Sequence, residues 1–253
     1  MRVLVLGASG MAGHKLLEHL SKNHEVAGSV REFFHPRLAP YKLYNGVDVR
    51  NPNSLLEPIR EFQPEVVFNA VGVVKQAQPR LADLAEINAC FPHKLASICK
   101  AKNLRLIHLS TDCVYSGRRG QYKETDTPDA DEPYGMSKLL GEPEEPALTI
   151  RTSLLGRELR GRVGLLEWFY AQTNGEVRGF RKAVFTGITT LELARVADLV
   201  ISRNPGLTGM WHVASEPINK YTLLQKINRE AQLDIRIEAD DQLQCDRSLD
   251  GNL

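Results

Sequence analysis

The sequence lacks the long apolar runs and the clustered cysteines of membrane proteins and disulfide-rich secreted proteins. Its apolar runs, such as residues 3–6, are far shorter than the ~20 residues that a membrane-spanning helix needs. The N-terminal residues contain no apolar h-region with a cleavage site. The four cysteines are widely separated and form no CxxC pair, which is typical of free thiols in a reducing compartment. We therefore expect a cytoplasmic protein that does not bind a membrane.

An excess of charge of one sign is also absent. The chain has 32 Lys and Arg against 31 Asp and Glu, so nothing indicates a nucleic-acid-binding protein. Hydrophobic residues make up 42% and charged residues 25%, which is ordinary for a globular protein and excludes intrinsic disorder. The length of 253 residues suits one large domain or a domain with an appendage. The seven histidines show no metal-ligand spacing, and His108, within an expected strand, is predicted to be a core residue.

Strands and helices alternate along the first part of the chain. Residues 2–6 form an aliphatic run of the kind found in a strand that is buried on both faces of a parallel sheet. Leu16, Leu17 and Leu20 then recur at helical spacing after a glycine-rich turn. Repeated units of this length predict right-handed crossovers and a doubly wound α/β sheet, the Rossmann fold. Further strands are predicted at 25–30, 64–68, 104–109, 147–151 and 210–213, and further helices at 53–62, 81–102 (kinked or split at Pro92), 134–142, 165–172, 190–202 and 221–231.

The glycine-rich turn contains Gly7, Gly10 and Gly13, between a strand and a helix. In that context glycine lets the backbone approach a pyrophosphate, and the helix N-terminus offers N–H groups and positive potential. The spacing is GxxGxxG, not GxGxxG. We therefore place this turn, with Ser9 and Met11, in a dinucleotide site. The alternative is that the glycines only shape the turn.

The residues after the second strand bear on cofactor choice. A dinucleotide site commonly has a carboxylate here for the ribose of NAD, or an arginine for the 2′-phosphate of NADP. Arg31 favours NADPH, but Glu32 adjoins it, and a solvated loop charge is the alternative. Asp48 and Val49 are weaker candidates for residues beside the adenine, since aspartates after strands are commonly turn residues.

Thr111, at a strand end, and the pair Tyr134 and Lys138 form the most specific pattern. Tyr and Lys at i and i+4 share one helix face. An ammonium beside a phenol favours phenolate and lowers a tyrosine pKa from its ordinary value of about 10. Lys138 can also bond to a nicotinamide ribose, and Thr111 can donate to the same carbonyl oxygen as Tyr134. This pattern predicts a proton-donor triad for a carbonyl that receives hydride from a nicotinamide. A surface helix pair is the alternative for an isolated YxxxK.

These stretches resemble the extended short-chain dehydrogenase/reductase family, and within it the dTDP-4-dehydrorhamnose reductases. The resemblance implies reduction of the 4-keto group of a nucleotide-linked 6-deoxy-4-ketohexose by NADPH or NADH. It implies that Thr111, Tyr134 and Lys138 are catalytic, and that Asn69, Ala70 and Val71 join the cofactor site. The matching stretches are residues 7–13, 69–72, 87–89, 109–117, 122–126, 133–142 and 151–153, with a further family feature at 247–250.

The resemblance also divides the chain into an NAD(P)-binding Rossmann domain at 1–155 and a smaller substrate-binding part at 156–253. We expect the second part to be mainly helical and intertwined with the first. The sequence departs from the family at residues 73–76 and 154–155, where sugar contacts are expected. No metal is carried over, and a homodimer is the expected assembly. Candidate residues for the nucleotide-sugar substrate are Lys75, Asp112, Cys113, Arg151, Trp168 (for which a core position is the alternative) and Thr186.

Two other functions remain open from the sequence. One is an NDP-sugar epimerase or 4,6-dehydratase on the same fold. By resemblance, a dehydratase has an Asp-Glu pair after the strand-end threonine, whereas here Asp112 is followed by Cys113. The other is a non-catalytic, NADP-binding regulatory subunit. The presence of both Tyr134 and Lys138 argues against that alternative, because a binding module has no need for the pair.

Overall fold

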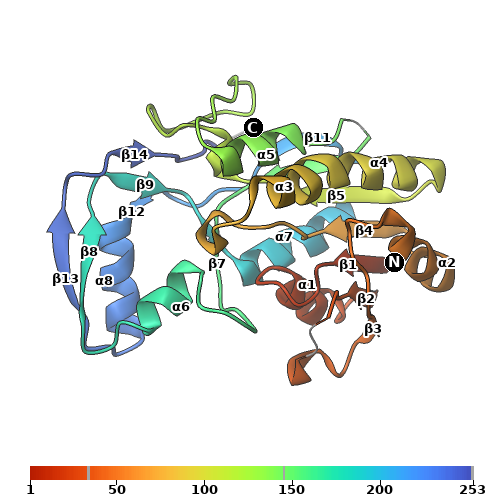
Figure 1. Cartoon of the computed structure of the whole chain (residues 1–253), viewed down its shortest axis with the longest axis horizontal. Helices are drawn as coiled ribbons and strands as arrows, with labels where there is room; N and C mark the ends of the chain where they lie inside the picture. Colours follow the sequence, from red (N-terminus) through yellow and green to blue (C-terminus); the bar gives the residue numbers. More distant parts are fainter. Residues whose placement is uncertain (33–34, 145, 252–253) are drawn as a thin grey trace.

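The computed structural model describes residues 1–32, 35–144 and 146–251, and its centre is a seven-stranded parallel sheet (Figure 1). The strand order is β11-β6-β5-β4-β1-β2-β3, so the order reverses between β1 and β4. Ligands of doubly wound sheets bind beyond the carboxyl ends of the strands at such a switch point. The strands are β1 (Arg2–Leu6), β2 (Glu25–Ser29), β3 (Lys42–Tyr44), β4 (Val66–Asn69), β5 (Arg105–Leu109), β6 (Leu148–Arg151) and β11 (Gly209–His212).

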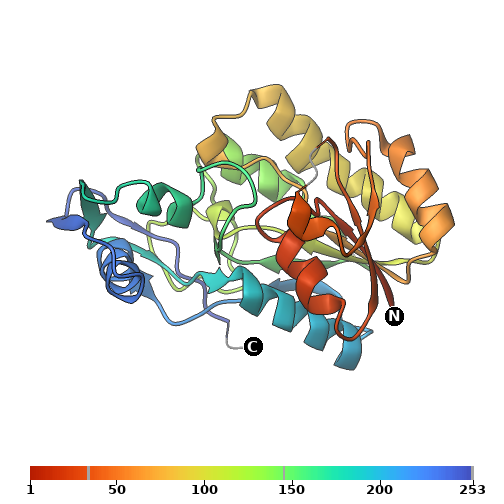
Figure 2. The ribbon, with the colours of Figure 1, turned by 90° about the horizontal axis from the view of Figure 1, so that it is seen from below.

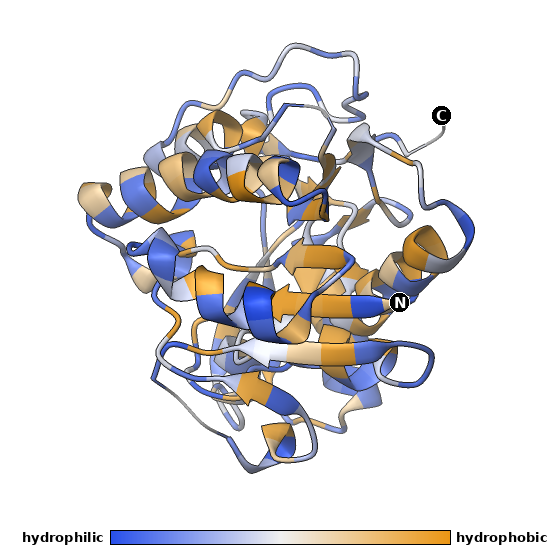
Figure 3. Cartoon of the chain, turned by 90° about the vertical axis from the view of Figure 1, so that its right-hand side faces the viewer, coloured by the Kyte–Doolittle hydropathy of each residue, from blue (hydrophilic) through white to orange (hydrophobic). Residues whose placement is uncertain are grey.

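The aliphatic run of β1 is buried on both faces, as its sequence predicts. Val3 and Val5 point into one hydrophobic core, while Leu4 and Leu6 point into the other. Helices α1 (Gly13–Leu20) and α7 (Thr190–Arg203) cover the first face, and α2 (Leu56–Phe62) and α4 (Phe91–Ala101) cover the second. Figure 2 shows these two helix layers on either side of the sheet, and Figure 3 shows that the central strands are mainly hydrophobic.

The long helical stretch predicted at 81–102 is divided into three parts. It begins as α3 (Leu81–Asp83), continues as a π-helix, η4 (Leu84–Cys90), and ends as α4. Pro92 lies in the first turn of α4. Proline has no N–H to give to the carbonyl of Asn88 four residues earlier, so a regular α-helix would lose that bond here. The predicted interruption at Pro92 therefore takes the form of a widened turn.

Residues after 155 contain more strand than the sequence predicted. We expected a mainly helical part, but α6 (Leu165–Tyr170) and α8 (Lys220–Glu230) are accompanied by short strands. β8 (Glu176–Phe180) pairs with β13 (Arg236–Asp240), beside α8 in Figure 1. Two further sheets are made of short strands. One is β12-β9-β14, made of Ile218–Asn219, Ala183–Phe185 and Cys245–Asp246, and the other is β10-β7, made of Ile188–Thr189 and Leu154–Leu155.

Residues from both halves of the chain build the Rossmann layers. α7 packs on α1, and β11 pairs with β6, although both α7 and β11 follow residue 155. The remaining 3-10 turns are η1 (Pro36–Leu38), η2 (Pro52–Leu55), η3 (Lys75–Ala77) and η5 (Asp112–Val114), and α5 (Pro133–Leu140) completes the helices. Across the described residues, no helix combines the length and the apolar character needed to cross a bilayer.

Candidate active site

The turn between β1 and α1 leaves no space for a side chain at its last glycine. A Cβ atom on Gly13 would lie 2.1 Å from the carbonyl oxygen of Gly7. Gly7 has a φ of +79°, which side-chain-bearing residues rarely adopt, and its carbonyl accepts a 2.9 Å hydrogen bond from the N–H of Gly10. Ser9 and Met11 are partly exposed in the same turn. The turn is therefore a tight backbone cradle at a helix N-terminus, which fits a pyrophosphate.

The segment after β4 lies against this turn. A Cβ atom on Gly7 would lie 3.1 Å from the side chain of Val71 and 3.2 Å from the carbonyl of Ala70. Asn69, in the same segment, is fully buried. Its side-chain amide donates to Nδ1 of His108 at 3.0 Å and accepts the N–H of Val71 at 3.1 Å. Asn69 therefore supports the segment from the core, as does His108, which is buried as its place in a strand predicted.

The residues predicted around the adenosine lie beyond β2 and β3. The side chain of Arg31 is 53% exposed, and its nearest carboxylate is Glu32, at 3.7 Å. The carboxylate of Asp48 accepts the backbone N–H of Arg50 at 3.0 Å, so Asp48 has the turn role that was the alternative for it. Val49 is buried. Arg31 thus keeps an exposed guanidinium, while Asp48 also serves a local turn.

The structure brings Thr111 and Tyr134 together. Thr111 follows β5, Tyr134 lies in the first turn of α5, and the Thr111 hydroxyl lies close enough to the phenol to act on its pKa. Burial raises the pKa of Tyr134 above its usual value, the nearby Cys113 adds to the rise, and Thr111 opposes it. Tyr134 is therefore protonated at neutral pH, which is the state that a proton donor needs.

Lys138 is buried one turn further along α5, and its ammonium donates to the carbonyl oxygen of Leu109 at 2.7 Å. Burial lowers its pKa to about 8, and Glu142 opposes that shift. The sequence predicted that Lys138 lowers the pKa of Tyr134, and this is not the arrangement observed. Burial dominates the tyrosine, and the ammonium is bonded to Leu109 instead.

Two glycines allow α5 to approach its neighbours. A Cβ atom on Gly135 would lie 2.1 Å from the carbonyl oxygen of Cys113, and one on Gly141 would lie 1.8 Å from the carbonyl oxygen of Asn88. The carbonyl of Asn88 is the one that receives no hydrogen bond from residue 92, because proline has no N–H. These contacts place α5 directly against η5 and the π-helix, and so bring Tyr134 to Thr111.

The substrate candidates Asp112 and Cys113 lie beside a cation that the sequence did not single out. Thr111 donates to Asp112 at 3.1 Å. Lys220, at the start of α8, lies with its ammonium 3.5 Å from the centre of the Phe185 ring, and its charge acts on Asp112 and Cys113. Burial raises the pKa of the Cys113 thiol to about 12 and also raises the pKa of Asp112.

The other predicted substrate cation next to α5 is Lys75, which forms an ion pair with Glu132. Glu132 also binds Arg247 at 3.0 Å, and Arg247 donates to the carbonyl of Tyr115 at 2.9 Å. The family feature at 247–250 therefore folds back onto the residues after Thr111. Resemblance to the family was the only sequence signal for this contact.

Two predicted substrate residues, Arg151 and Thr186, are enclosed in the protein. Arg151 is 5% exposed, and its guanidinium is bonded to Glu142 and to the hydroxyl of Tyr115. The hydroxyl of Thr186 is buried and accepts the N–H of Leu249 at 3.0 Å. Both side chains are occupied by protein groups and are not presented to a ligand.

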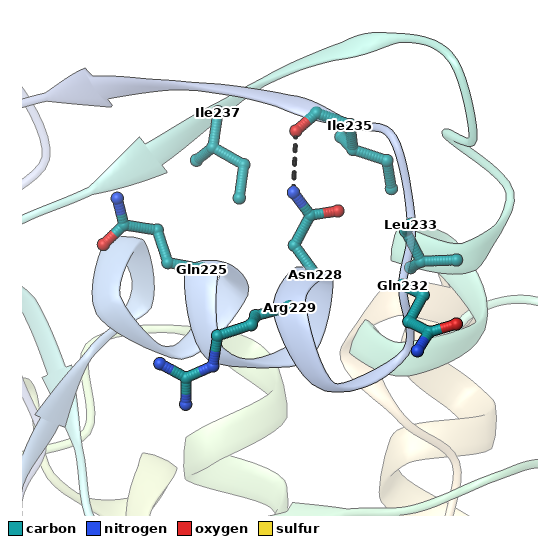
Figure 4. Close-up of a pocket in the computed structure, with 7 residues that line it drawn as sticks. All are labelled: Gln225, Asn228, Arg229, Gln232, Leu233, Ile235 and Ile237. Atoms are coloured by element: carbon teal, nitrogen blue, oxygen red, sulfur yellow. Dashed lines mark hydrogen bonds between the residues drawn. The ribbon is translucent and has the colours of Figure 1, made fainter.

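Trp168, on α6, is 38% exposed, while its neighbour Phe169 is fully buried. The core position considered for Trp168 thus belongs to Phe169. A separate pocket of about 440 Å³ lies between α8 and β13 and is lined by none of the predicted site residues (Figure 4). Among the residues that the structure describes, no group of three His, Cys, Asp or Glu side chains is arranged to hold a metal ion.

Asn88 is a residue of the site region to which sequence reasoning gave no role. Its amide oxygen accepts the N–H of Val73 at 2.9 Å, and its amide nitrogen donates to the Val73 carbonyl and to the hydroxyl of Ser137. Ser137 in turn donates to the carbonyl of Tyr134 at 2.7 Å. Asn88 therefore joins the segment after β4 to the helix of Tyr134.

Comparisons with known proteins agree with this geometry. The family model described as the RmlD substrate binding domain matches residues 1–247. A probable dTDP-4,6-dihydroxy-2-methyloxan-3-one 4-ketoreductase of Streptomyces antibioticus is 31% identical over 240 residues, which cover 90% of this chain and 77% of that protein.

Solved structures share the fold over almost the whole chain. A hypothetical dTDP-4-dehydrorhamnose reductase from Sulfolobus tokodaii gives a TM-score of 0.84 at 28% identity, covering 99% of this chain and 92% of that one. A dTDP-4-dehydrorhamnose reductase from Bacillus anthracis, solved in complex with NADP, gives 0.82 at 20% identity, covering 99% and 90%.

Proposed function

The chain belongs to the RmlD substrate binding domain family, and we propose that it reduces the 4-keto group of a nucleotide-linked 6-deoxy-4-ketohexose. It is an NAD(P)-dependent oxidoreductase. The observation that carries the proposal is the proximity of Thr111 to Tyr134, with Lys138 buried one turn further along α5, at the carboxyl ends of the strands where the glycine turn also lies. The 4-ketoreductase of Streptomyces antibioticus, at 31% identity, supports the same reaction.

The reduced nicotinamide, when bound, supplies hydride to C4 of the sugar. The backbone at Gly7, Gly10 and Gly13 would hold the pyrophosphate, because the turn admits no side chain at Gly13. Ala70 and Val71 would lie along the other side of the cofactor. NADPH is favoured over NADH, since Arg31 offers an exposed guanidinium to a 2′-phosphate.

Tyr134 would give its proton to the ketone oxygen as the carbonyl becomes an alcohol. Its raised pKa keeps that proton in place until negative charge develops on the oxygen. Thr111 lies beside the phenol and would orient the ketone for it. Lys138 would contact the nicotinamide ribose, and its positive charge would stabilise the phenolate that remains after proton transfer.

The residues after Thr111 support a reductase against a 4,6-dehydratase. Elimination of water needs a base at C5 and an acid for the departing hydroxyl. Burial raises the pKa of Cys113 to about 12, so its thiol is not a base at neutral pH. Asp112 is bonded by Thr111, and burial raises its pKa. The regulatory-subunit alternative has no comparable support, because such a subunit does not need an assembled triad.

Other features of the chain extend the proposal. We assign cofactor binding to residues 1–155 and substrate binding mainly to residues 156–253, with Asp112, Cys113, Lys75 and Trp168 facing the nucleotide sugar. The free thiols are consistent with a cytoplasmic location. A homodimer through α5 is supported by the exposed apolar side chains of Met136 and Leu140.

Two parallel assays test the function. In the first, the protein is mixed with NADPH and a 4-keto-6-deoxy sugar nucleotide, and we expect NADPH oxidation stoichiometric with product. In the second, the parent NDP-hexose is incubated with NAD(P)⁺, and we expect no 4-keto product. Dehydration of the parent hexose without net cofactor consumption would contradict the proposal.

A further inference from the structure

A buried ion pair lies directly behind the triad. Glu142 and Arg151 have side chains that are 7% and 5% exposed, and they meet through two hydrogen bonds, from Nε at 2.8 Å and from Nη2 at 2.7 Å. The third guanidinium nitrogen, Nη1, donates to the hydroxyl of Tyr115 at 2.8 Å. A charge pair this enclosed is costly to desolvate and is seldom the most stable solution for a core. Its position therefore calls for a functional explanation.

Glu142 also binds the strand end that carries Thr111. The hydroxyl of Ser110 donates to Oε1 of Glu142 at 2.6 Å, and Ser110 directly precedes Thr111. Arg151 lies at the end of β6, and the Ser110 N–H donates to the carbonyl of Ile150 in that strand. The carboxylate of Glu142, which lies just beyond α5, thus links the ends of β5 and β6.

The same carboxylate lies four residues after Lys138, and its charge opposes the fall in the pKa of that ammonium. The other groups around Lys138 supply no negative charge. His108, from β5, is buried, and its pKa is lowered by burial and by the charge of Lys138. Tyr134 is a neutral phenol, and the carbonyl of Leu109 is a neutral acceptor.

We propose that Glu142 is a positioning residue of the reductase site: it holds Thr111 in register with α5 through Ser110, and Arg151 fixes the carboxylate in place. This inference rests on the proposed function for the roles of Thr111 and Lys138. It also gives a role to the buried guanidinium of Arg151, which is bonded to Glu142. Arg151 acts on the reaction through Glu142.

The two partners of the pair have different expected effects, which separates this proposal from a merely structural role. Glu142→Gln removes a negative charge that favours the charged form of Lys138, so the pKa of Lys138 should fall. As the pH rises, Lys138 then loses its charge at a lower pH than it does in wild type. Arg151→Met breaks the same ion pair but leaves the carboxylate, so the pKa of Lys138 does not fall. Glu142→Asp keeps the charge.

The test measures NADPH affinity and kcat/KM as functions of pH for wild type and these three variants. A single change leaves one buried charge unpaired and can prevent folding. The double variant Glu142→Met/Arg151→Met avoids this, because it replaces the whole buried pair with apolar side chains. Glu192→Gln, which removes an exposed ion pair on α7, is the control for a general effect of charge. Thermal unfolding is recorded for every variant.

For Glu142→Gln and for the folded double variant, we expect NADPH affinity and kcat/KM to begin their alkaline fall at a pH at least 0.5 units lower than in wild type. We also expect kcat to be at least tenfold lower. For Glu142→Asp and Arg151→Met, the alkaline fall stays within 0.3 units of wild type. A folded double variant with wild-type kcat and pH profile overturns the proposal, as do equal shifts in Glu142→Gln and Arg151→Met. NADPH binding needs no sugar, so this readout remains valid if wild type reduces no 4-keto sugar, which would refute the proposed function alone.

Discussion

Gly135 and Cys113 are in direct backbone contact: a Cβ atom on residue 135 would lie 2.1 Å from the Cys113 carbonyl oxygen. Cys113 lies two residues after Thr111 and Gly135 directly follows Tyr134, so the contact sets how closely the helix of the phenol approaches the strand end. Gly135→Ala should therefore displace α5 and lower kcat at least ~10-fold, because small displacements of reacting groups are costly. Steady-state kinetics and thermal unfolding check this. Gly206→Ala is a control for glycine replacement without contacts, since a Cβ atom there would have no atom within 4 Å and its φ is not positive.

Tyr134→Phe keeps the ring and removes the acid aimed at the ketone oxygen. We expect kcat to fall by at least ~100-fold, while NADPH affinity stays close to that of wild type. Tyr122→Phe is a suitable control, because Tyr122 is a buried tyrosine in the loop after Thr111 with no proposed role in proton transfer. Turnover of Tyr134→Phe within a few-fold of wild type would reject the assignment of Tyr134 as the proton donor.

Lys138 should set the alkaline limit of activity. Burial lowers its pKa from 10.5 to about 8, so the charged form predominates below that pH and is lost as the pH rises through it. If the charged form binds the ribose and stabilises the phenolate, NADPH affinity and kcat/KM should fall together above about pH 8. Lys138→Met should lower both quantities at every pH. Unchanged cofactor affinity in this variant would show that Lys138 does not contact the ribose.

Arg31→Ala tests cofactor choice. A guanidinium on the 2′-phosphate of NADPH forms a charge-assisted hydrogen bond of about 1.5–3 kcal/mol. Its loss should abolish the preference for NADPH over NADH, as measured by the ratio of their kcat/KM values. Glu32→Gln is the matched control, since it removes the competing carboxylate and should strengthen the preference. Equal use of both cofactors by the wild-type protein would contradict this role for Arg31.

Leu140→Glu tests the proposed homodimer. Leu140 is 67% exposed on α5, and a carboxylate introduced there should prevent the burial of that face. We expect the variant to elute as a monomer at concentrations where wild type is a dimer. Leu199→Glu, at an exposed apolar position on α7, is the control and should leave the dimer intact. A wild-type protein that is monomeric at high concentration would remove the basis for the dimer.

The first half of the fold follows from its sequence because local patterns and tertiary contacts agree there. The run of residues 3–6 can only be a strand covered on both faces, and the spacing of Gly7, Gly10 and Gly13 is that of a turn into a helix. The same agreement made Tyr134 and Lys138 recognisable. Their spacing, followed by Gly141, describes a helix that packs closely on its neighbours.

The parts that could not be predicted depend on partners far away in the chain. β8 and β13 are 5 residues each, and each becomes a strand only by pairing with the other across 55 intervening residues. The protein partner of Arg151 could not be predicted for a related reason. An arginine near a site suggests a phosphate ligand, and its pairing with Glu142 depends on where β6 meets the end of α5.

The pairing of β11 with β6 and the return of Arg247 to the Thr111 segment also affect the order in which the protein can fold during synthesis. Domains generally fold from the N-terminus as they leave the ribosome. Here the edge of β6 stays uncovered until residues 209–212 have emerged, and Arg247 cannot reach Glu132 until residue 247 has been made. A nascent chain halted at residue 205 would carry the glycine turn, Tyr134 and Lys138 but expose an unpaired, aggregation-prone strand edge. Enzyme activity should therefore appear only after residue 247 has left the ribosome.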